Sequence, residues 1–498
     1  MLTVLVFLPL AGGFALLLLP RNAKRIAATM AILTTIADLA ISVWMSLPFF
    51  SPSASSVALQ IEQHASWVPG LGAEYALAID GINMPLVLLT TLLSLLAIIY
   101  SAYGKEQGIE EPGNGYFFLL LLMETGLLGF FLASDLLLFY VFWEVAIVPL
   151  YFIIGIWGHE QRRKAAMKFF LYTRAASLAL LLGILALYVH TNPRTFSMQA
   201  IQSAGHGLGP TVPAFLVLVA FAIGFGIKLP VVPLHSWLPD AHVEAPTPGS
   251  VMLAGMLLKM GGYGFIRVML PSVGAAWARA GTVFLVFAVV NIIYGAAVAL
   301  AQSDFKRLVA FTSINHMGFV LLGATIAVLN IPEADRLIAL NGAVLQMVSH
   351  GLLTGGMFFL VGMLQKRVGT RQFSEFGGGW GKLPGYAVVL TTFALGSFGL
   401  PSMSGFVAEF QVFAATLTVH IWAAALAAFG VVISTALYLW MLQRILFGRP
   451  TEKMEMAWDL RVPDVIVMGL LAVAIFAIGL FPGRLLAAIE RGASSLLR

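Results

Sequence analysis

The feature that most constrains this chain is a succession of long apolar segments joined by short polar loops. A run of about 18 or more apolar residues can cross a bilayer as a helix, and only 10% of the 498 residues are charged. Soluble domains carry about 25% charged residues, so the sequence predicts an all-α polytopic membrane protein. We expect about 14 transmembrane helices, over residues 2–20, 26–48, 80–103, 115–133, 135–157, 166–190, 212–236, 246–270, 278–301, 307–330, 337–364, 384–418, 420–447 and 463–482.

Two of these predicted helices are interrupted. Helix 7 breaks at KLPVVP, where prolines remove backbone donors, and helix 12 is too long for one straight helix and contains LGSFGLPSMSG. Broken helices at corresponding positions of two halves are typical of inverted repeats in transporters. We therefore expect two inverted five-helix repeats, spans 4–8 and 9–13. The predicted division is 1–110 for helices 1–3, 111–272 and 273–450 for the two repeats, and 451–498 for helix 14 and the tail.

The distribution of Lys and Arg indicates the orientation, because short cytoplasmic loops are enriched in these residues. Most of the 28 Lys and Arg residues, including Arg21 and Lys105, fall on one predicted face. That face is expected to be cytoplasmic, which places both termini and the polar loop 49–76 on the other side. The net charge of +5 arises in these loops and does not indicate nucleic-acid binding.

Several kinds of site are excluded by composition and motifs. The chain has no cysteine, which excludes disulfides, cysteine-held iron–sulfur clusters and thiolate zinc sites. It also lacks a phosphate-binding glycine loop, an HExxH motif and a haem-type CxxCH motif. We therefore expect no metal and no cofactor in this chain.

Ionisable residues inside the spans mark the candidate site, because a charge at bilayer depth costs about 3 kcal/mol on insertion scales. Lys228 follows the uncharged stretch 212–227, and Glu144 lies near the centre of span 135–157. Two unit charges 4 Å apart gain about 4 kcal/mol at an effective dielectric constant of 20. We expect Glu144 and Lys228 to pair. A static ion pair is the alternative, but the helix break beside Lys228 favours a functional one.

Lys259 and Glu409 are two further buried candidates. Lys259 lies in mid-span between Gly255 and Gly261, and small residues allow close helix packing. Because burial disfavours the charged form, Lys259 is predicted to exchange its proton and act as a relay. Glu409 follows the break in helix 12 and has no basic residue in its own span, which favours a functional role.

Histidines add groups that titrate near physiological pH. His235 lies two helical turns after Lys228, and small or hydroxyl residues around His316 and His350 leave room for water. These three are predicted to relay protons. His242 lies in a predicted loop, PDAHVEAPTPG, and is a possible modulator.

Glu124 and Arg174, inside spans 4 and 6, are possible modulators. They could pair with each other, or they could bias Glu144 and Lys228. The residues leave structural and functional roles equally open for both.

Four segments carry a resemblance to a known family. They are LLLFYVFWEVAIVPLYFIIGIWG, FGIKLPVVPLHSWLPDAHVEAPTPGSVMLAGMLLKMGGYGF, SDFKRLVAFTSINHMGF and LPSMSGFVAEF. They resemble the proton-pumping membrane family shared by respiratory complex I and multisubunit cation/proton antiporters, and the resemblance covers residues 75–450. Glu409 is the discriminating residue, because sister subunits and antiporters typically have lysine there. It points to one antiporter-like subunit of complex I.

The resemblance implies a role for each candidate. Glu144 and Lys228 match the family's charged pair, Lys259 matches its central lysine, and Glu409 matches the last group before proton exit. The histidines of the hydrated axis are matched by His235, His316 and His350. Arg174 departs from the family, where an uncharged polar residue is more usual, and Glu124 varies among relatives.

The implied function is that of a proton-translocating membrane-arm subunit of the enzyme NADH:quinone oxidoreductase. NADH, FMN, iron–sulfur clusters and a quinone such as ubiquinone would bind to partner subunits, and no redox site is expected here. The implied partners are antiporter-like subunits L and N, small membrane subunits and lipids. The implied location is a bacterial plasma (inner) membrane with both termini periplasmic.

The expected mechanism takes protons from the cytoplasm to Lys228 or Lys259, through His316 and His350, and out by Glu409. Separation of Glu144 from Lys228 would act as the switch. A subunit of a multisubunit Na⁺/H⁺ (Mrp-type) antiporter is the alternative within the family. A purely structural membrane scaffold is the alternative from another class.

Overall fold

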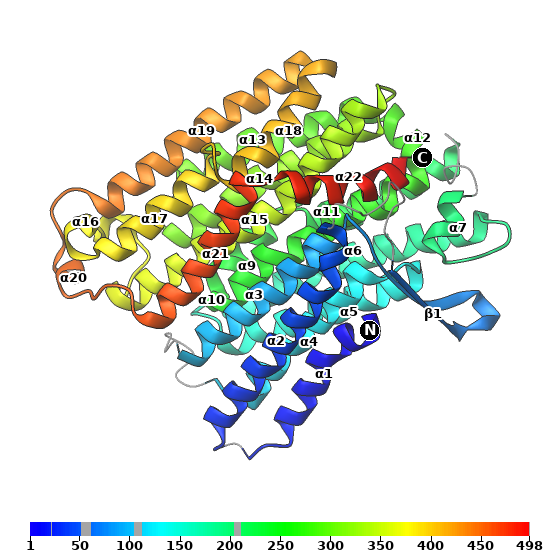
Figure 1. Ribbon diagram of the computed structural model, residues 1–498. Helices are drawn as coiled ribbons and strands as arrows, with labels where there is room; N and C mark the ends of the chain where they lie inside the picture. The colour runs from blue at the N-terminus through cyan, green and yellow to red at the C-terminus, as the bar shows by residue number, and fades with distance from the viewer. Residues whose placement is uncertain (21, 51–60, 104–111, 204–210, 498) are drawn as a thin grey trace.

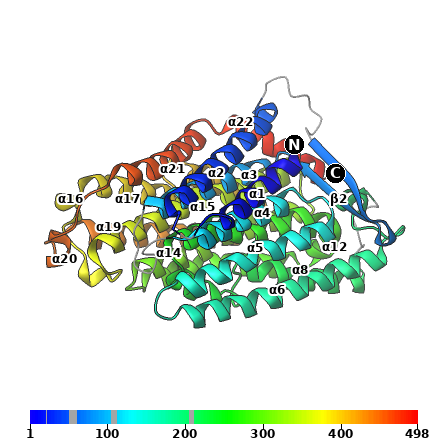
Figure 2. The ribbon, with the colours of Figure 1, turned by 90° about the horizontal axis from the view of Figure 1, so that it is seen from below.

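The computed structural model describes residues 1–20, 22–50, 61–103, 112–203 and 211–497. Its helices run side by side in an elongated bundle (Figures 1 and 2). Within the described ranges, eleven helices are long and apolar enough to cross a membrane, and three more apolar helices have 10–17 residues. The predicted polytopic helical fold is confirmed, while the number of crossings stays a prediction. Arg21, Lys105 and part of the 49–76 loop lie outside the described residues.

Ten of the long helices are single α-helices. They are α2 (Lys24–Ser46), α3 (Met84–Tyr103), α4 (Asn114–Leu132), α5 (Leu136–Trp157), α6 (Arg162–His190), α13 (Gly281–Leu300), α14 (Phe305–Val328), α15 (Glu333–Val368), α19 (Ile421–Leu446) and α21 (Val462–Leu480). The eleventh runs from Thr247 to Arg279 and joins α10 (Thr247–Met252), α11 (Leu258–Gly264) and α12 (Leu270–Arg279).

The remaining helices are shorter. They are α1 (Leu2–Leu17), α7 (Met198–Ser203), α8 (Val212–Lys228), α9 (Trp237–Glu244), α16 (Gly379–Lys382), α17 (Pro384–Ser397), α18 (Ser404–Val419), α20 (Glu452–Glu455) and α22 (Gly483–Leu497).

Both predicted helix breaks are present. Helix α8 ends at Lys228 and the chain becomes helical again in α9, while α17 ends at Ser397 and α18 begins at Ser404. In the second break Gly399 has φ +83°, a conformation that glycine adopts without steric cost. The prolines interrupt the backbone hydrogen bonds of the helix at the first break. The turn at Gly399 interrupts them at the second, also in the apolar interior.

Three helical segments form the centre of the bundle. The most apolar windows of α14 and α15 are 100% buried and that of Thr247–Arg279 is 94% buried, against 22% for the peripheral α21. Polar side chains on these inner helices are shielded from lipid by other helices. This is the setting in which ionisable residues persist in membrane proteins.

A two-stranded sheet replaces part of the predicted loop 49–76. Strand β1 (Ile61–Val68) pairs antiparallel with β2 (Ala73–Ile79) and projects beyond the helices (Figure 1). The turn between them contains Pro69 and Gly70, and Gly72 has φ +65°. The predicted helical fold class stands, but the sequence analysis treated this segment as a polar loop and did not predict the hairpin.

Two other segments are more ordered than predicted. His242 lies on the short helix α9 and not in a loop. The predicted C-terminal tail forms α22, which packs on α15 and lies across the bundle (Figure 1). Both termini lie at the same end of the bundle as the hairpin, opposite α16 and α20 (Figures 1 and 2).

A buried ion pair fixes the end of the hairpin to the centre. Arg267 Nη2 lies 2.5 Å from Asp80 Oδ2, and the two side chains are 10% and 5% exposed. The other Asp80 oxygen accepts bonds from the backbone N–H groups of Ile82 and Asn83. This arrangement ties the start of α3 to the π-helical turn Phe265–Met269.

Removal of one partner of this ion pair should destabilise the fold. Asp80→Ala leaves the Arg267 charge buried and unpaired, which typically costs about 3–5 kcal/mol. The free energy of unfolding in mild detergent should fall for Asp80→Ala and for Arg267→Met. The double variant should lose less free energy of unfolding than the two single variants lose together. Fully additive losses would contradict the pairing, and Glu62→Ala, on the exposed strand β1, is the acidic control.

Candidate functional site

Four of the predicted residues form one connected series at the centre of the bundle. Lys259 Nζ of α11 lies 2.6 Å from His350 Nδ1 of α15. The ring centroids of His350 and His316 are 5.7 Å apart, a gap that one bridging water can span. His316 Nδ1 of α14 lies 3.2 Å from Glu409 Oε1 of α18. These contacts join residues up to 93 positions apart in the sequence into one series.

All four groups are withdrawn from lipid and bulk solvent. Lys259 is 0% exposed, His350 2%, His316 5% and Glu409 6%. Each has hydrogen-bonding capacity, and the two histidines can accept a proton on one ring nitrogen and release one from the other. The series can therefore conduct protons between a buried ammonium and a buried carboxylate.

Gln346 completes the far end of the series and was missed by the sequence analysis. Its amide nitrogen lies 3.3 Å from Glu409 Oε1 and 3.4 Å from His316 Nδ1. Gln346 precedes His350 by four residues, and residues at that spacing share one face of a helix. The four-residue spacing from His350 was the signal in the sequence from which Gln346 could have been predicted.

The backbone around Lys259 departs from the α-helix on both sides. Leu253–Leu257 and Phe265–Met269 are π-helical turns. In the first turn the Leu258 N–H bonds to the Leu253 carbonyl, and the Ala254 carbonyl accepts a hydrogen bond from Lys259 Nζ. Single π-turns inside α-helices occur frequently at functional sites. Here the first turn supplies the carbonyl that holds the ammonium inside the helix bundle.

Lys228 lies at the C-terminal end of α8 and is 0% exposed. Among the described residues its Nζ has no hydrogen-bond partner, and it lies over the rings of Trp143 and Phe169, 5.4 and 5.5 Å from their centroids. A cation over an aromatic face is stabilised by the ring quadrupole. This partly replaces the carboxylate contact that the sequence predicted.

The predicted direct pair between Glu144 and Lys228 is wrong for this conformation. Glu144 forms its ion pair with Arg174 of α6. The carboxylate is 20% exposed and the guanidinium 37%, so the pair lies towards the outer side of α5 and α6, whereas Lys228 points inward.

Glu124 does not pair with Arg174 either. It is fully buried in α4 and interacts with Asp38 of α2, a residue that the sequence analysis did not consider. Arg174 instead forms an ion pair with Glu144. Glu124 therefore lies apart from the Lys259–Glu409 series.

His235 lies in the break between α8 and α9, and its Nε2 is 3.2 Å from the Tyr294 hydroxyl. The break itself is held by Asn291 of α13, whose Oδ1 accepts from Val232 N at 2.7 Å and whose Nδ2 donates to Pro230 O. An amide in an otherwise apolar helix was the signal for this bracing role. His235 shares no hydrogen bond with the central series.

His242 is fully buried on α9 and stacks on Phe358 of α15, with ring centroids 4.4 Å apart. Among the described residues neither ring nitrogen has a hydrogen-bond partner. Over all the residues that the structure describes, no group of three or more His, Cys, Asp and Glu residues is arranged to hold a metal ion.

Comparisons with known proteins place this geometry in a family. Residues 133–434 match the family described as NADH:quinone oxidoreductase/Mrp antiporter, TM. The chain is 39% identical over 491 residues to "NAD(P)H-quinone oxidoreductase chain 4 1" of Synechococcus sp. (strain JA-3-3Ab), covering 97% of this chain and 90% of the relative. It is 35% identical over 505 residues to "NADH-quinone oxidoreductase subunit M" of Rickettsia felis, covering 100% and 98%.

A solved structure gives the same result. A chain of respiratory complex I from Thermus thermophilus with bound NADH matches with a TM-score of 0.87 and 30% identity, covering 100% of both chains. These relatives, named chain 4 and subunit M, confirm the predicted resemblance to one antiporter-like subunit of complex I. The chain belongs to the NADH:quinone oxidoreductase/Mrp antiporter transmembrane family.

Proposed function

We propose that the chain is a proton-translocating membrane-arm subunit of an NADH:quinone oxidoreductase. One observation carries the proposal: Lys259, His350, His316 and Glu409 are buried and follow one another at hydrogen-bond or single-water distances. A structural scaffold has no need of a connected series of titratable groups in its core. In this proposal NADH, FMN, iron–sulfur clusters and the quinone belong to partner subunits.

Proton transfer along the series begins at Lys259. The ammonium donates a proton towards His350 Nδ1, and the proton that leaves the other ring nitrogen passes by water to His316. Glu409 then takes it from His316 Nδ1, while the Gln346 amide steadies the carboxylate. The Ala254 carbonyl accepts a hydrogen bond from Lys259 Nζ and so holds the ammonium at the start of the series.

Lys228 supplies the switch in this scheme. Glu144 is held by Arg174, and Lys228 Nζ has no hydrogen-bond partner among the described residues in this conformation. If Glu144 turns from Arg174 to Lys228, Lys228 holds its proton more tightly. Gly261 brings α11 against the end of α8, where a Cβ at this position would lie 2.5 Å from Leu229 N. A change at Lys228 can therefore reach the helix that carries Lys259.

The arrangement of the subunit in the membrane is part of the proposal. The two repeats would be residues 111–272 and 273–450, with the broken helices at Lys228 and before Glu409. The Lys- and Arg-rich end would face the cytoplasm of a bacterial cell. An isolated two-stranded hairpin is marginally stable in water, so the projecting β1–β2 hairpin suits contact with neighbouring membrane subunits such as L and N.

A subunit of a multisubunit Na⁺/H⁺ (Mrp-type) antiporter is the second candidate, because the family description covers both kinds of complex. Glu409 favours the oxidoreductase, since antiporter relatives typically place lysine there. Purification in mild detergent distinguishes the two candidate functions. Co-purification with flavin and iron–sulfur subunits supports the oxidoreductase, whereas their absence from an intact, active antiporter complex would contradict it.

Lys259→Met should leave the complex assembled and slow proton transfer through the series. A positioned acid–base group typically contributes about 10²–10⁴-fold, so the initial rate of NADH-driven acidification of inverted vesicles should fall by about 10²-fold or more. Lys453→Met, on the exposed helix α20, is the matched control. An unchanged rate in Lys259→Met would contradict the role of Lys259.

Glu144→Gln should assemble yet lose most proton pumping, because it removes the carboxylate that acts on Lys228. A change of one pKa unit corresponds to about 1.36 kcal/mol, which is a tenfold change in the ratio of protonated to deprotonated lysine. The ratio of protons pumped to NADH oxidised in sealed vesicles is the measurement. Glu452→Gln, exposed on α20, serves as control, and normal pumping by Glu144→Gln would rule out the switch.

Arg174→Gln should release Glu144 from its present partner. The carboxylate should then turn towards Lys228, and a structure of the variant should show a Glu144–Lys228 ion pair within 4 Å, the usual limit for such a pair. If Glu144 remains directed at α6 in the variant, Arg174 is not what keeps the two residues apart.

A further inference from the structure

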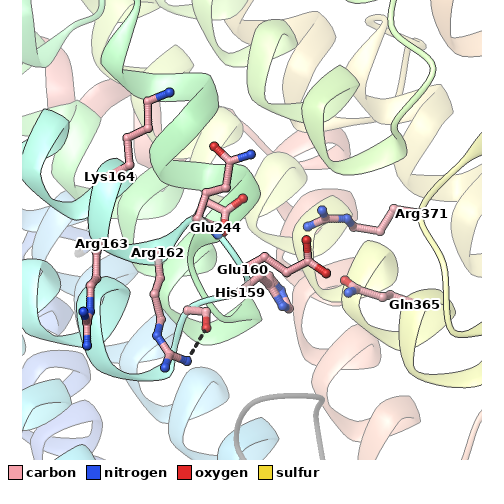
Figure 3. Close-up of a pocket in the computed structure, with 10 residues that line it drawn as sticks. His159, Glu160, Arg162, Arg163, Lys164, Glu244, Gln365 and Arg371 are labelled. Carbon is pink, nitrogen blue, oxygen red and sulfur yellow. Dashed lines mark hydrogen bonds between the residues drawn. The ribbon is translucent and has the colours of Figure 1, made fainter.

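Two cavities in the described part of the chain differ in their chemistry. One, of about 990 Å³, is lined mainly by charged and polar side chains, with Arg163 and Lys164 on one side and Arg371 opposite (Figure 3). The other has a volume of about 540 Å³, and Arg484 is the one charged residue among the described residues that line it. An apolar cavity with a single cation at its edge suits a ligand that has both an apolar and an anionic part.

The second cavity is a groove between α3 and α21, and we call it the α3–α21 groove. Its lining runs from Pro85 to Leu92 along α3, and from Ala474 of α21 to Phe481, which follows that helix. Seven residues of α-helix rise about 10 Å, so the groove follows both helices for about two turns. Its walls are apolar throughout this length.

Helix α15 forms the floor of the groove through Val348 and Leu352. These two residues are four apart and therefore share one face of the helix. His350 lies midway between them in the sequence, so it is on the opposite face, where its Nδ1 contacts Lys259. Whatever fills the groove therefore covers the back of the helix that carries His350.

Arg484 lies at the mouth of the groove, in the first turn of α22. Its side chain is exposed and forms no hydrogen bond or ion pair with the described residues. Helix α22 lies across the bundle (Figure 1), buries Ala488 and Ile489, and exposes Glu490. A helix in this orientation, with one apolar and one charged face, lies at the level of the lipid headgroups. The groove thus leads from headgroup level into the hydrocarbon region.

We propose that an anionic phospholipid binds in the α3–α21 groove, with one acyl chain between the two helices and its phosphate on Arg484. Each buried CH₂ group of the chain contributes to binding, and the guanidinium can donate two parallel hydrogen bonds to phosphate oxygens. Water has no polar partner along the apolar walls. The lipid also covers the floor formed by α15 and keeps water from that side of the helix. This site does not depend on the proposed proton translocation.

A transmembrane helix of a partner subunit is the alternative occupant, and the size of the groove disfavours it. A helix with its side chains is about 10–12 Å across, so 10 Å of its length occupies about 800 Å³ or more. The groove offers about 540 Å³. An acyl chain is thinner and can follow the groove between the side chains of both helices.

The direct test is a structure of the complex that contains this chain, in nanodiscs of phosphatidylglycerol and phosphatidylcholine. Elongated density should run from the Arg484 guanidinium to the level of Leu92 and Ala474. An empty groove, or a helix of another subunit within it, would overturn the proposal.

Lipid analysis by mass spectrometry after purification in mild detergent tests the groove itself. Ala474→Phe places a ring between the two helices, so the complex should lose one bound phospholipid. Val473→Phe, at a position that is 69% exposed and does not line the groove, is the matched control and should keep it. Retention of the same number of phospholipids by Ala474→Phe would contradict the site.

Arg484→Ala tests the headgroup contact and decides the matter if Ala474→Phe does not assemble. The variant should bind phosphatidylglycerol in preference to phosphatidylcholine about fivefold less strongly than the unchanged complex, the effect of one basic residue at a lipid surface. Arg194→Ala, exposed beside the hairpin at the same end of the bundle, is the control. An unchanged preference in Arg484→Ala would overturn the proposed phosphate contact.

Discussion

The structure depends on the cost of placing a charge inside a membrane. An ammonium or carboxylate at bilayer depth is tolerated only where other protein groups or water replace its hydration. The chain meets this condition by placing Lys259, His316 and His350 on the three most buried helical segments, α11, α14 and α15. Peripheral helices provide the lipid-facing surface and leave the centre polar.

The irregular backbone follows from the same requirement. A regular helix satisfies its own carbonyls, so it offers none to a buried lysine. The π-turn before Lys259 leaves the Ala254 carbonyl for its ammonium. The break after Lys228 is held by Asn291, and the break before Glu409 turns through Gly399. These three departures from helical geometry each lie beside a charged group of the site.

Much of this could be predicted from the sequence. Hydropathy located α5 to within one residue, at Leu136–Trp157 against a predicted 135–157. It also located both breaks, because prolines and glycines interrupt apolar runs there. The residues of the central series were predicted individually, because each is an ionisable group in an apolar run. Their contacts were not, since helix rotation decides which side chains meet.

Glu144 shows this limit most clearly. Sequence spacing places it and Lys228 at similar depths, but the face that Glu144 presents is directed to Arg174 on α6. Asp38 beside Glu124 and Gln346 beside Glu409 were missed for the same reason. The hairpin β1–β2 was missed because its turn residues lie in a polar loop. The most direct test of the central claim is the number of protons pumped per NADH oxidised in sealed vesicles when His316, the middle link of the series, is changed to Phe. The account predicts a large fall with the complex still assembled, and an unchanged ratio would contradict it.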